Sequence, residues 1–332
     1  MCLLYITEHN RKIHLQSGRF IITDKNNVLL KSIPRQTVTG ISIFGNSQLS
    51  SHCIHYCLNN NVPVSFFSHS GRCYGHLSNL CNQNTSRIRK QFSLTLDKSF
   101  VLTMAKKFIT AKIHNQSVVA TRYLKSDHIN SPLSSLLQIY TTKAKTAANI
   151  ASLRGFEGMA AREYFSVLSS LLPKEFQFDN RTRRPPEDPF NTMLSLGYSL
   201  LCKEIAGEVE NRGLLSQAGF LHDEYRTRPS LACDMIEEWR PVIVDSLVMS
   251  LIRKHEIAIT DFSYRDGSCS LSPDGLKLFL SKFETRLLTE SKYISSVNRP
   301  ITFRQAIWHQ ANNMMKLIEE NDVSLYQPVF IR

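Results

Sequence analysis

A histidine and two carboxylates that lie near one another in the chain have the residue types of a metal site. His222 follows an apolar turn, and Asp234 and Glu237 come soon after it. Ser230, behind Pro229, is a good helix N-cap, and a helix that starts there puts Asp234 and Glu237 on one face. Two carboxylates on one face repel each other, which is tolerable when a cation neutralises them.

The cation need not be a metal. Arg240 stands three residues beyond Glu237 and could neutralise the face as an ordinary salt bridge. A single histidine is also more often a satisfied core residue than a ligand, so His222 alone does not decide between the two interpretations.

A third carboxylate, Glu157, lies among small residues in a segment with helical periodicity. Gly158 and Ala161 fill little space, which leaves room for something to approach the carboxylate closely. The apolar positions that we expect to face a core are Leu153, Phe156, Ala160 and Leu168. A solvated helix glutamate is the alternative.

An imidazole together with carboxylate oxygens suits Mn²⁺ or Mg²⁺ better than structural zinc. Such a site can polarise a phosphodiester and activate an attacking oxygen, which is nuclease chemistry.

Basic residues surround these segments and favour a polyanionic partner. The 332 residues carry a formal charge of +12, and nucleic acid is the leading candidate partner. Excess charge can also simply keep a basic enzyme dispersed. The arginines placed to hold a phosphate backbone are Arg181, Arg183, Arg184, Arg226 and Arg228, and an exposed solvated loop is the alternative for each.

The first eighty residues have strand chemistry and predict a small β-rich domain. A hairpin at Asn26-Asn27 and bends at Gly18 and Gly71 separate the runs, and residues 47–60 predict one helix. The predicted strands are residues 3–6, 20–22, 28–30, 40–44, 62–67 and 73–77.

After a polar stretch at 79–86 the pattern becomes helical, so the fold class is α+β, with an all-helical C-terminal domain. A stripe of Phe100, Met104, Phe108, Ala111 and Asn115 marks the first long helix, with Lys106, Lys107 and Lys112 on its other faces. Further helices are predicted at about 134–172, 190–212, 230–255, 274–289 and 302–319.

The N-terminus does not have the features of a secretory signal, no stretch reaches transmembrane length, and the scattered cysteines fit reduced thiols. We therefore expect a cytoplasmic protein without disulfides or membrane contact. The cluster His52–Cys57 has spacing that zinc could use, but interleaved apolar residues favour buried helix cysteines.

Several motifs resemble those of the CRISPR-associated endonuclease of the spacer-acquisition complex, its integrase subunit, over essentially the full length. The most specific are Arg154-Gly-Phe-Glu-Gly-Met-Ala-Ala-Arg-Glu-Tyr-Phe, Arg184-Pro-Pro-Glu-Asp-Pro-Phe-Asn191, Gly219-Phe-Leu-His222 and Ser230-Leu-Ala-Cys-Asp-Met-Ile-Glu-Glu-Trp-Arg-Pro241. Ser216 stands where this family often has proline, which leaves the shape of that loop open.

The resemblance implies that Glu157, His222 and Glu237 bind Mn²⁺ or Mg²⁺, and that Asp234 joins them as a catalytic residue, through water or by orienting its neighbours. Predicted DNA contacts are Arg184, Arg226, Arg228, Arg240 and Tyr164. The implied reaction is transesterification, in which a prespacer 3′-hydroxyl attacks a phosphodiester of the CRISPR repeat.

The implied partners are double-stranded DNA, a second copy of the chain and a small ferredoxin-like CRISPR-associated protein. We expect residues 1–80 to be the dimerisation domain, 81–88 a linker and 89–332 the catalytic domain. Two rival functions are a non-catalytic DNA-bridging protein and a metal hydrolase of small phosphoesters, and the second would not require the high positive charge.

Overall fold

In the computed structural model the chain divides into two compact units, 1–81 with 270–280, and 82–269 with 281–332. The structure describes residues 2–68, 71–77, 84–182, 185–222, 228–292, 297 and 299–332. The first unit matches the predicted β-rich region but also takes in Ser270–Leu280, an association between distant segments that no local pattern reveals.

The first unit contains two four-stranded sheets, with strand orders β1-β5-β7-β8 and β4-β3-β2-β6. The strands are β1 (Cys2–Ile6), β2 (Lys12–Gln16), β3 (Arg19–Thr23), β4 (Leu29–Pro34), β5 (Val38–Phe44), β6 (Gln48–Leu49), β7 (Val64–Phe67) and β8 (Cys73–Leu77). In the first sheet β1, β5 and β7 run parallel, and β8 is antiparallel to β7. The predicted strands are thus confirmed, while β2 and β6 were not predicted.

A two-residue turn joins β2 to β3. Ser17 and Gly18 both have positive φ, 50° and 74°, which is the backbone of a type I′ turn and fits the twist of a hairpin. The predicted bend at Gly18 is therefore confirmed, and it fixes the antiparallel register of these strands.

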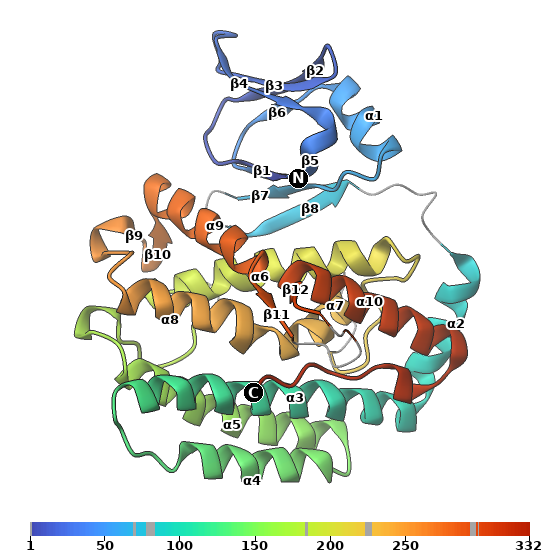
Figure 1. Ribbon diagram of the computed structural model, residues 1–332, viewed down its shortest axis with the longest axis vertical. Helices are drawn as coiled ribbons and strands as arrows, with labels where there is room; N and C mark the ends of the chain where they lie inside the picture. The colour runs from blue at the N-terminus through green and yellow to red at the C-terminus, as the bar shows by residue number, and fades with distance from the viewer. Residues whose placement is uncertain are drawn as a thin grey trace. The chain divides into compact units, whose positions relative to one another are not determined.

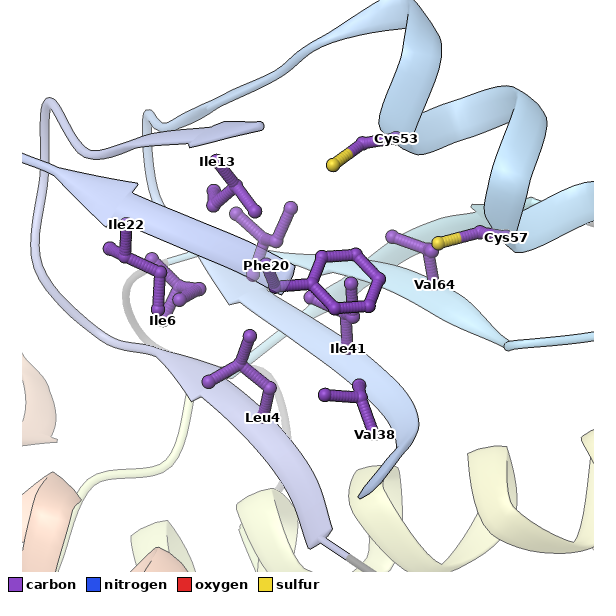
Figure 2. Packing of buried hydrophobic residues seen from close by; sticks show 11 residues of the cluster. Leu4, Ile6, Ile13, Phe20, Ile22, Val38, Ile41, Cys53, Cys57 and Val64 are labelled. Atoms are coloured by element: carbon purple, nitrogen blue, oxygen red, sulfur yellow. The ribbon is translucent and has the colours of Figure 1, made fainter. Parts of the chain in front are cut away.

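Buried apolar side chains between the strands and α1 (Ser51–Asn59) form the core of the first unit (Figure 2). Phe20 and Ile41 have no exposed surface, and Cys53 and Cys57 of α1 point into the same cluster. Burial raises the pKa of the Cys57 thiol to about 12, which makes it a poor thiolate ligand. The core interpretation of the His52–Cys57 cluster is confirmed.

The rest of the chain is mainly helical, which confirms the predicted fold class (Figure 1). The helices that follow α1 are α2 (Thr85–Leu96), α3 (Lys98–Ser126), α4 (Leu133–Lys145), α5 (Ile150–Ser170), α6 (Pro189–Glu210), α7 (Ser230–Met235), α8 (Ser246–Arg253), α9 (Pro273–Leu287) and α10 (Phe303–Glu320). Residues 273–280 of α9 belong to the first unit. The C-terminal region is not entirely helical, contrary to the prediction, because it contains two short two-stranded sheets. These are β9 (Phe262–Arg265) with β10 (Ser268–Leu271), and β11 (Glu290–Ser291) with β12 (Ile301–Thr302). Within the described ranges, no helix combines the length and apolar character needed to cross a membrane.

Capping residues set the helix boundaries where the predictions were imprecise. Asn84 accepts a hydrogen bond from the Arg87 backbone, so α2 begins inside the predicted linker. Asn149 and Ser152 form a capping box that starts α5 and divides the predicted stretch 134–172 into α4 and α5.

The long helix α3 packs beside α4 and α5 (Figure 1). The predicted stripe from Phe100 to Asn115 is buried, as expected. Ile109, Ile113 and Gln116 are buried as well, so α3 is enclosed on more than one side.

The segment predicted as one helix at 230–255 changes its winding twice. After α7 comes a 3₁₀ turn, Ile236–Glu238, and then π-helical turns, Arg240–Asp245, before α8 begins. Pro241 cannot donate a backbone hydrogen bond and so interrupts the regular ladder. Ser230 is the first helical residue and not the N-cap, which corrects that prediction.

Candidate metal centre

Asp234 fixes the orientation of His222. Its buried carboxylate accepts hydrogen bonds from the backbone N–H groups of Phe220, Leu221 and His222, at 2.5, 2.9 and 3.0 Å. The His222 ring lies against the same carboxylate, with Nδ1 2.7 Å from Asp234 Oδ1. A carboxylate only accepts, so Nδ1 carries a proton, and the neutral imidazole then presents the Nε2 lone pair that a metal ion needs.

Glu237 lies within reach of that lone pair. Its Oε1 is 3.8 Å from His222 Nε2 and 3.0 Å from Arg240 Nη1. Burial by itself would raise the pKa of Glu237, but the cations of Arg240 and Lys112 outweigh burial and lower that pKa to about 2. The carboxylate is therefore ionised at neutral pH.

Lys112 joins Glu237 to Glu157. Its ammonium makes a short hydrogen bond to Glu157 Oε1 and lies 2.7 Å from Glu237 Oε2. Burial lowers the pKa of Lys112, but the two glutamates reverse that effect and leave the pKa above its ordinary value. One cation is therefore already held between the two carboxylates that the sequence assigned to a metal.

The surface beside Glu157 is open. Glu157 is itself 26% exposed, and Gly158, which follows it on α5, is exposed, with nothing within 4 Å of an added Cβ. Leu153, Ala160 and Leu168 of the predicted core stripe are fully buried, while Phe156 is only half-buried beneath Lys143. The expected room for close approach to Glu157 is present.

The donor set fits a hard divalent cation, because it offers two carboxylates and one oriented imidazole. In the described part of the chain, no three His, Cys, Asp or Glu side chains are already gathered closely enough to hold a metal ion. His222 and Glu237 face each other, and Lys112 bridges Glu237 to Glu157.

The prediction that Tyr164 contacts DNA is wrong in this structure. Its side chain has no exposed surface, and its hydroxyl donates a 3.0 Å hydrogen bond to Asp245. Tyr198 donates to the same carboxylate at 2.5 Å. Tyr164 therefore connects α5 to the π-helical turns that follow the Glu237 turn.

Asp245 should make stability fall as the pH rises. Burial raises its pKa from 3.8 to about 6, although the two tyrosines and nearby arginines lower it. Its contribution is therefore complete below about pH 4 and is lost as the pH rises through 6. Asp245→Asn removes the titration, and the wild type should lose up to about 3 kcal/mol relative to this variant between about pH 4 and 7.

Urea unfolding of both proteins at several pH values measures that difference. Other carboxylates titrate equally in the two proteins and cancel. A free-energy difference that does not change with pH would contradict the assigned ionisation of Asp245.

The predicted arginine contacts fall into three groups. Arg184 and Arg226 lie outside the described residues. Arg228 is exposed, and its side chain makes a hydrogen bond with Cys233. Arg240 is mostly buried, paired with Glu237 and stacked on the Tyr198 ring at 4.8 Å, so it belongs to the centre itself.

Lys112 is the site residue that the sequence analysis misplaced. It was assigned to a face of α3 other than the apolar stripe, yet its side chain is only 7% exposed. The spacing indicated burial, because Lys112 follows the stripe residue Phe108 by four positions; Ile109 and Gln116 beside it on the helix are buried as well.

Gly219 lets the His222 segment pass close to the start of α7. An added Cβ would lie 2.7 Å from Asp234 Oδ2 and 2.8 Å from the Leu231 nitrogen. Gly219→Ala must therefore displace backbone, and we expect a loss of about 2 kcal/mol or more together with most metal-dependent activity.

Gly207→Ala is the matched control for this substitution. Gly207 lies in α6, and its Cβ would meet nothing within 4 Å. We expect it to gain up to about 1 kcal/mol in chemical denaturation, because alanine favours a helix. Equal effects of the two substitutions would contradict the close approach at Gly219.

Comparison with known proteins identifies the family. The family model described as CRISPR associated protein Cas1 matches residues 4–285. A CRISPR-associated endonuclease Cas1 from Methanospirillum hungatei JF-1 is 33% identical over 314 residues, covering 92% of this chain and 87% of the relative.

Solved structures give the same result. A casposase bound to integration product has a TM-score of 0.87 at 27% identity, over 99% of this chain and 93% of that one. A Cas6-RT-Cas1–Cas2 complex shares the fold, with a TM-score of 0.85 at 23% identity over 100% of this chain and 36% of that one. The match at both levels confirms the resemblance found in the motifs, and the chain belongs to the CRISPR-associated Cas1 family.

Proposed function

We propose that this chain is a metal-dependent DNA endonuclease and integrase that inserts prespacer DNA into a CRISPR array, with Glu157, His222 and Glu237 as metal ligands. The observation that carries the proposal is that Glu157 and Glu237 together hold a buried cation, the Lys112 ammonium. The His222 ring lies next to Glu237, on the same cluster. The endonuclease names of Cas1 relatives and the similarity to a casposase bound to integration product support it.

The chain's own residues prepare the centre for a phosphodiester. Asp234 holds the His222 ring with Nε2 toward Glu237, and Arg240 keeps Glu237 ionised and in place. When bound, Mn²⁺ or Mg²⁺ would polarise a phosphoryl oxygen and favour departure of the 3′-oxygen.

The proposed reaction exchanges one phosphodiester for another. A prespacer 3′-hydroxyl forms a bond to phosphorus, the bond from that phosphorus to the repeat's 3′-oxygen breaks, and the proton passes from the attacking to the departing oxygen. No external energy source is needed, because one phosphodiester is made for each one broken. With water as the nucleophile the same centre would hydrolyse DNA.

DNA is the proposed substrate, and the charge of +12 supports this proposal. Arg228 is exposed near the His222 segment and is the described residue best placed to hold the phosphate backbone. Arg184 and Arg226 remain proposed contacts.

Two protein partners are also proposed, a second copy bound through residues 1–80 and a small ferredoxin-like adaptation protein. Apolar residues around the start of β4, an edge strand, support the first partner, since Leu29 and Leu30 are 60% and 49% exposed and Val28, just before the strand, is 57% exposed. The similar structure that contains Cas1 and Cas2 supports the second.

The proposal is tested by incubating the protein with a labelled prespacer duplex that has free 3′-hydroxyls and a plasmid that carries a CRISPR repeat. The label joined to the plasmid is measured. Joined products should form with Mn²⁺ or Mg²⁺, disappear with chelator, and disappear in Glu157→Gln. Glu163→Gln is the control, because Glu163 lies on the same helix beside Arg162 and has no described contact with the centre.

DNA binding separates the rival functions. With chelator present, Glu157→Gln should bind the duplex as the wild type does, with an affinity that falls steeply with salt. Binding without any metal-dependent cleavage in the wild type would favour a DNA-bridging protein. Cleavage of small phosphoesters without salt-sensitive DNA binding would favour a small-molecule hydrolase.

A further inference from the structure

The Lys112 ammonium occupies the position at which Glu157 and Glu237 come together. Its side chain is 7% exposed, Glu237 is 2% exposed and Glu157 is 26% exposed, so the three groups form a largely dry cluster. Lys112 lies in the middle of α3 and bonds to an oxygen of each glutamate. The proposed reaction gives the Lys112 ammonium no role.

An ammonium and a divalent ion cannot share this position. Divalent ions bind carboxylate oxygens at about 2.1 Å for Mg²⁺. The Lys112 nitrogen already lies 2.7 Å from Glu237 Oε2, so its protons fill the space that such an ion would take. Two positive centres at that separation also repel strongly where water is excluded.

The charge balance of the centre also disfavours a divalent ion beside Lys112. Three carboxylates, from Glu157, Asp234 and Glu237, lie with two cations, Lys112 and Arg240. Adding a divalent ion while both cations stay would leave excess positive charge in a partly buried site. One further anion restores the balance, and a DNA phosphate is the anion that the proposed substrate brings.

Lys112 also has the means to move. Its four-carbon stem is flexible and its ammonium donates in three directions, so it can exchange carboxylate partners for a phosphate without a change in α3. Glu157 is 26% exposed, so its side of the cluster is open to solvent.

We infer that Lys112 couples metal binding to DNA binding: its ammonium competes with the metal ion for Glu157 and Glu237 in the free protein, and a DNA phosphate draws it away. This inference rests on the proposed function and adds a regulation of the same centre. The metal then binds weakly without DNA and more tightly with it, and by linkage DNA binds more tightly when metal is present. Such coupling would limit adventitious hydrolysis by the free protein.

The test measures Mn²⁺ affinity by calorimetry, with and without a short duplex, after subtraction of a duplex-only titration. In the wild type, DNA should tighten Mn²⁺ binding about tenfold or more. Lys112→Met should bind Mn²⁺ about tenfold more tightly than the wild type without DNA, and DNA should then add less than about threefold. Lys106→Met, on the same helix and away from the centre, should behave as the wild type.

Lys112→Arg keeps the charge and guards against a folding artefact. It should retain the weak DNA-free affinity of the wild type, while the melting temperature of Lys112→Met should rise more on Mn²⁺ addition than that of the wild type. Unchanged or weaker Mn²⁺ binding by Lys112→Met, or undiminished coupling to DNA, would overturn the inference.

These results are separable from failure of the proposed function. Suppose that Glu157→Gln and Glu237→Gln weaken Mn²⁺ binding and abolish joining, while Lys112→Met changes neither the Mn²⁺ affinity nor its coupling to DNA binding. The proposed metal centre is then supported, and the inferred role of Lys112 is wrong. If neither glutamine variant weakens Mn²⁺ binding, the proposed centre is itself wrong.

Discussion

Glu237→Gln should abolish metal-dependent cleavage and joining, by about a thousandfold or more, in a protein that remains folded. The substitution keeps the shape of the side chain but removes the charge on which Lys112 and Arg240 converge. A neutral amide is also a much poorer ligand for a hard divalent ion. Mn²⁺ affinity should fall along with activity.

The ionisation of Glu237 gives this prediction a pH signature. Its pKa is lowered to about 2 from 4.5, so its contribution to stability is complete above about pH 4.5 and is lost as the pH falls through 2. The carboxylate is charged throughout the physiological range. Any change of wild-type activity between about pH 5 and 8 must therefore come from another group.

The measurement is single-turnover joining of a labelled prespacer at saturating protein, beside circular dichroism melting. Glu163→Gln, whose carboxylate is 34% exposed and contacts Arg162 at 3.5 Å, should keep wild-type activity. Residual joining within tenfold of the wild type would remove Glu237 from the ligand set. An unfolded Glu237→Gln would instead mark it as a structural ion pair.

Local patterns in the sequence predicted several elements well. The apolar stripe of α3 follows from helical spacing and the bend at Gly18 from the backbone freedom of glycine, and both are confirmed. The join of Ser270–Leu280 to the first unit could not be predicted in this way, because it depends on contacts between segments far apart in the chain.

The two misplaced site residues differ in what helical spacing indicated. Lys112 lies at the edge of the α3 stripe, four residues after Phe108, whereas Tyr164 lies between Ala160 and Leu168 on the apolar side of α5, so spacing favoured its burial. Their partners, Glu157 and Glu237 for the first and Asp245 for the second, come from other elements. Helical periodicity carries no information about such partners.

Asp234→Ala and His222→Ala should differ in their effect on stability, although both should lose activity. Asp234 is fully buried and accepts three backbone hydrogen bonds as well as the His222 ring. Its removal leaves buried donors without an acceptor, and we expect a loss of about 3–5 kcal/mol in stability together with loss of activity. His222 is 20% exposed, and its removal should cost only about 1 kcal/mol while activity falls about a thousandfold.

Asp234→Asn isolates the orienting role. Its single carbonyl oxygen can still accept from part of the backbone segment, but its amide no longer fixes the proton on His222 Nδ1. We expect Mn²⁺ affinity to fall about 10-fold to 100-fold, with a smaller loss of stability than in Asp234→Ala.

Chemical denaturation and Mn²⁺ titration of the three variants test this assignment together. If His222→Ala unfolds, His222 is a core residue and not a ligand. If Asp234→Ala loses activity without losing stability, its four hydrogen bonds contribute little to the fold, and direct metal ligation becomes the better account of Asp234. The predicted order, with Asp234→Ala least stable and His222→Ala stable but inactive, requires that the hydrogen bonds hold the loop and that the ring then serves the metal.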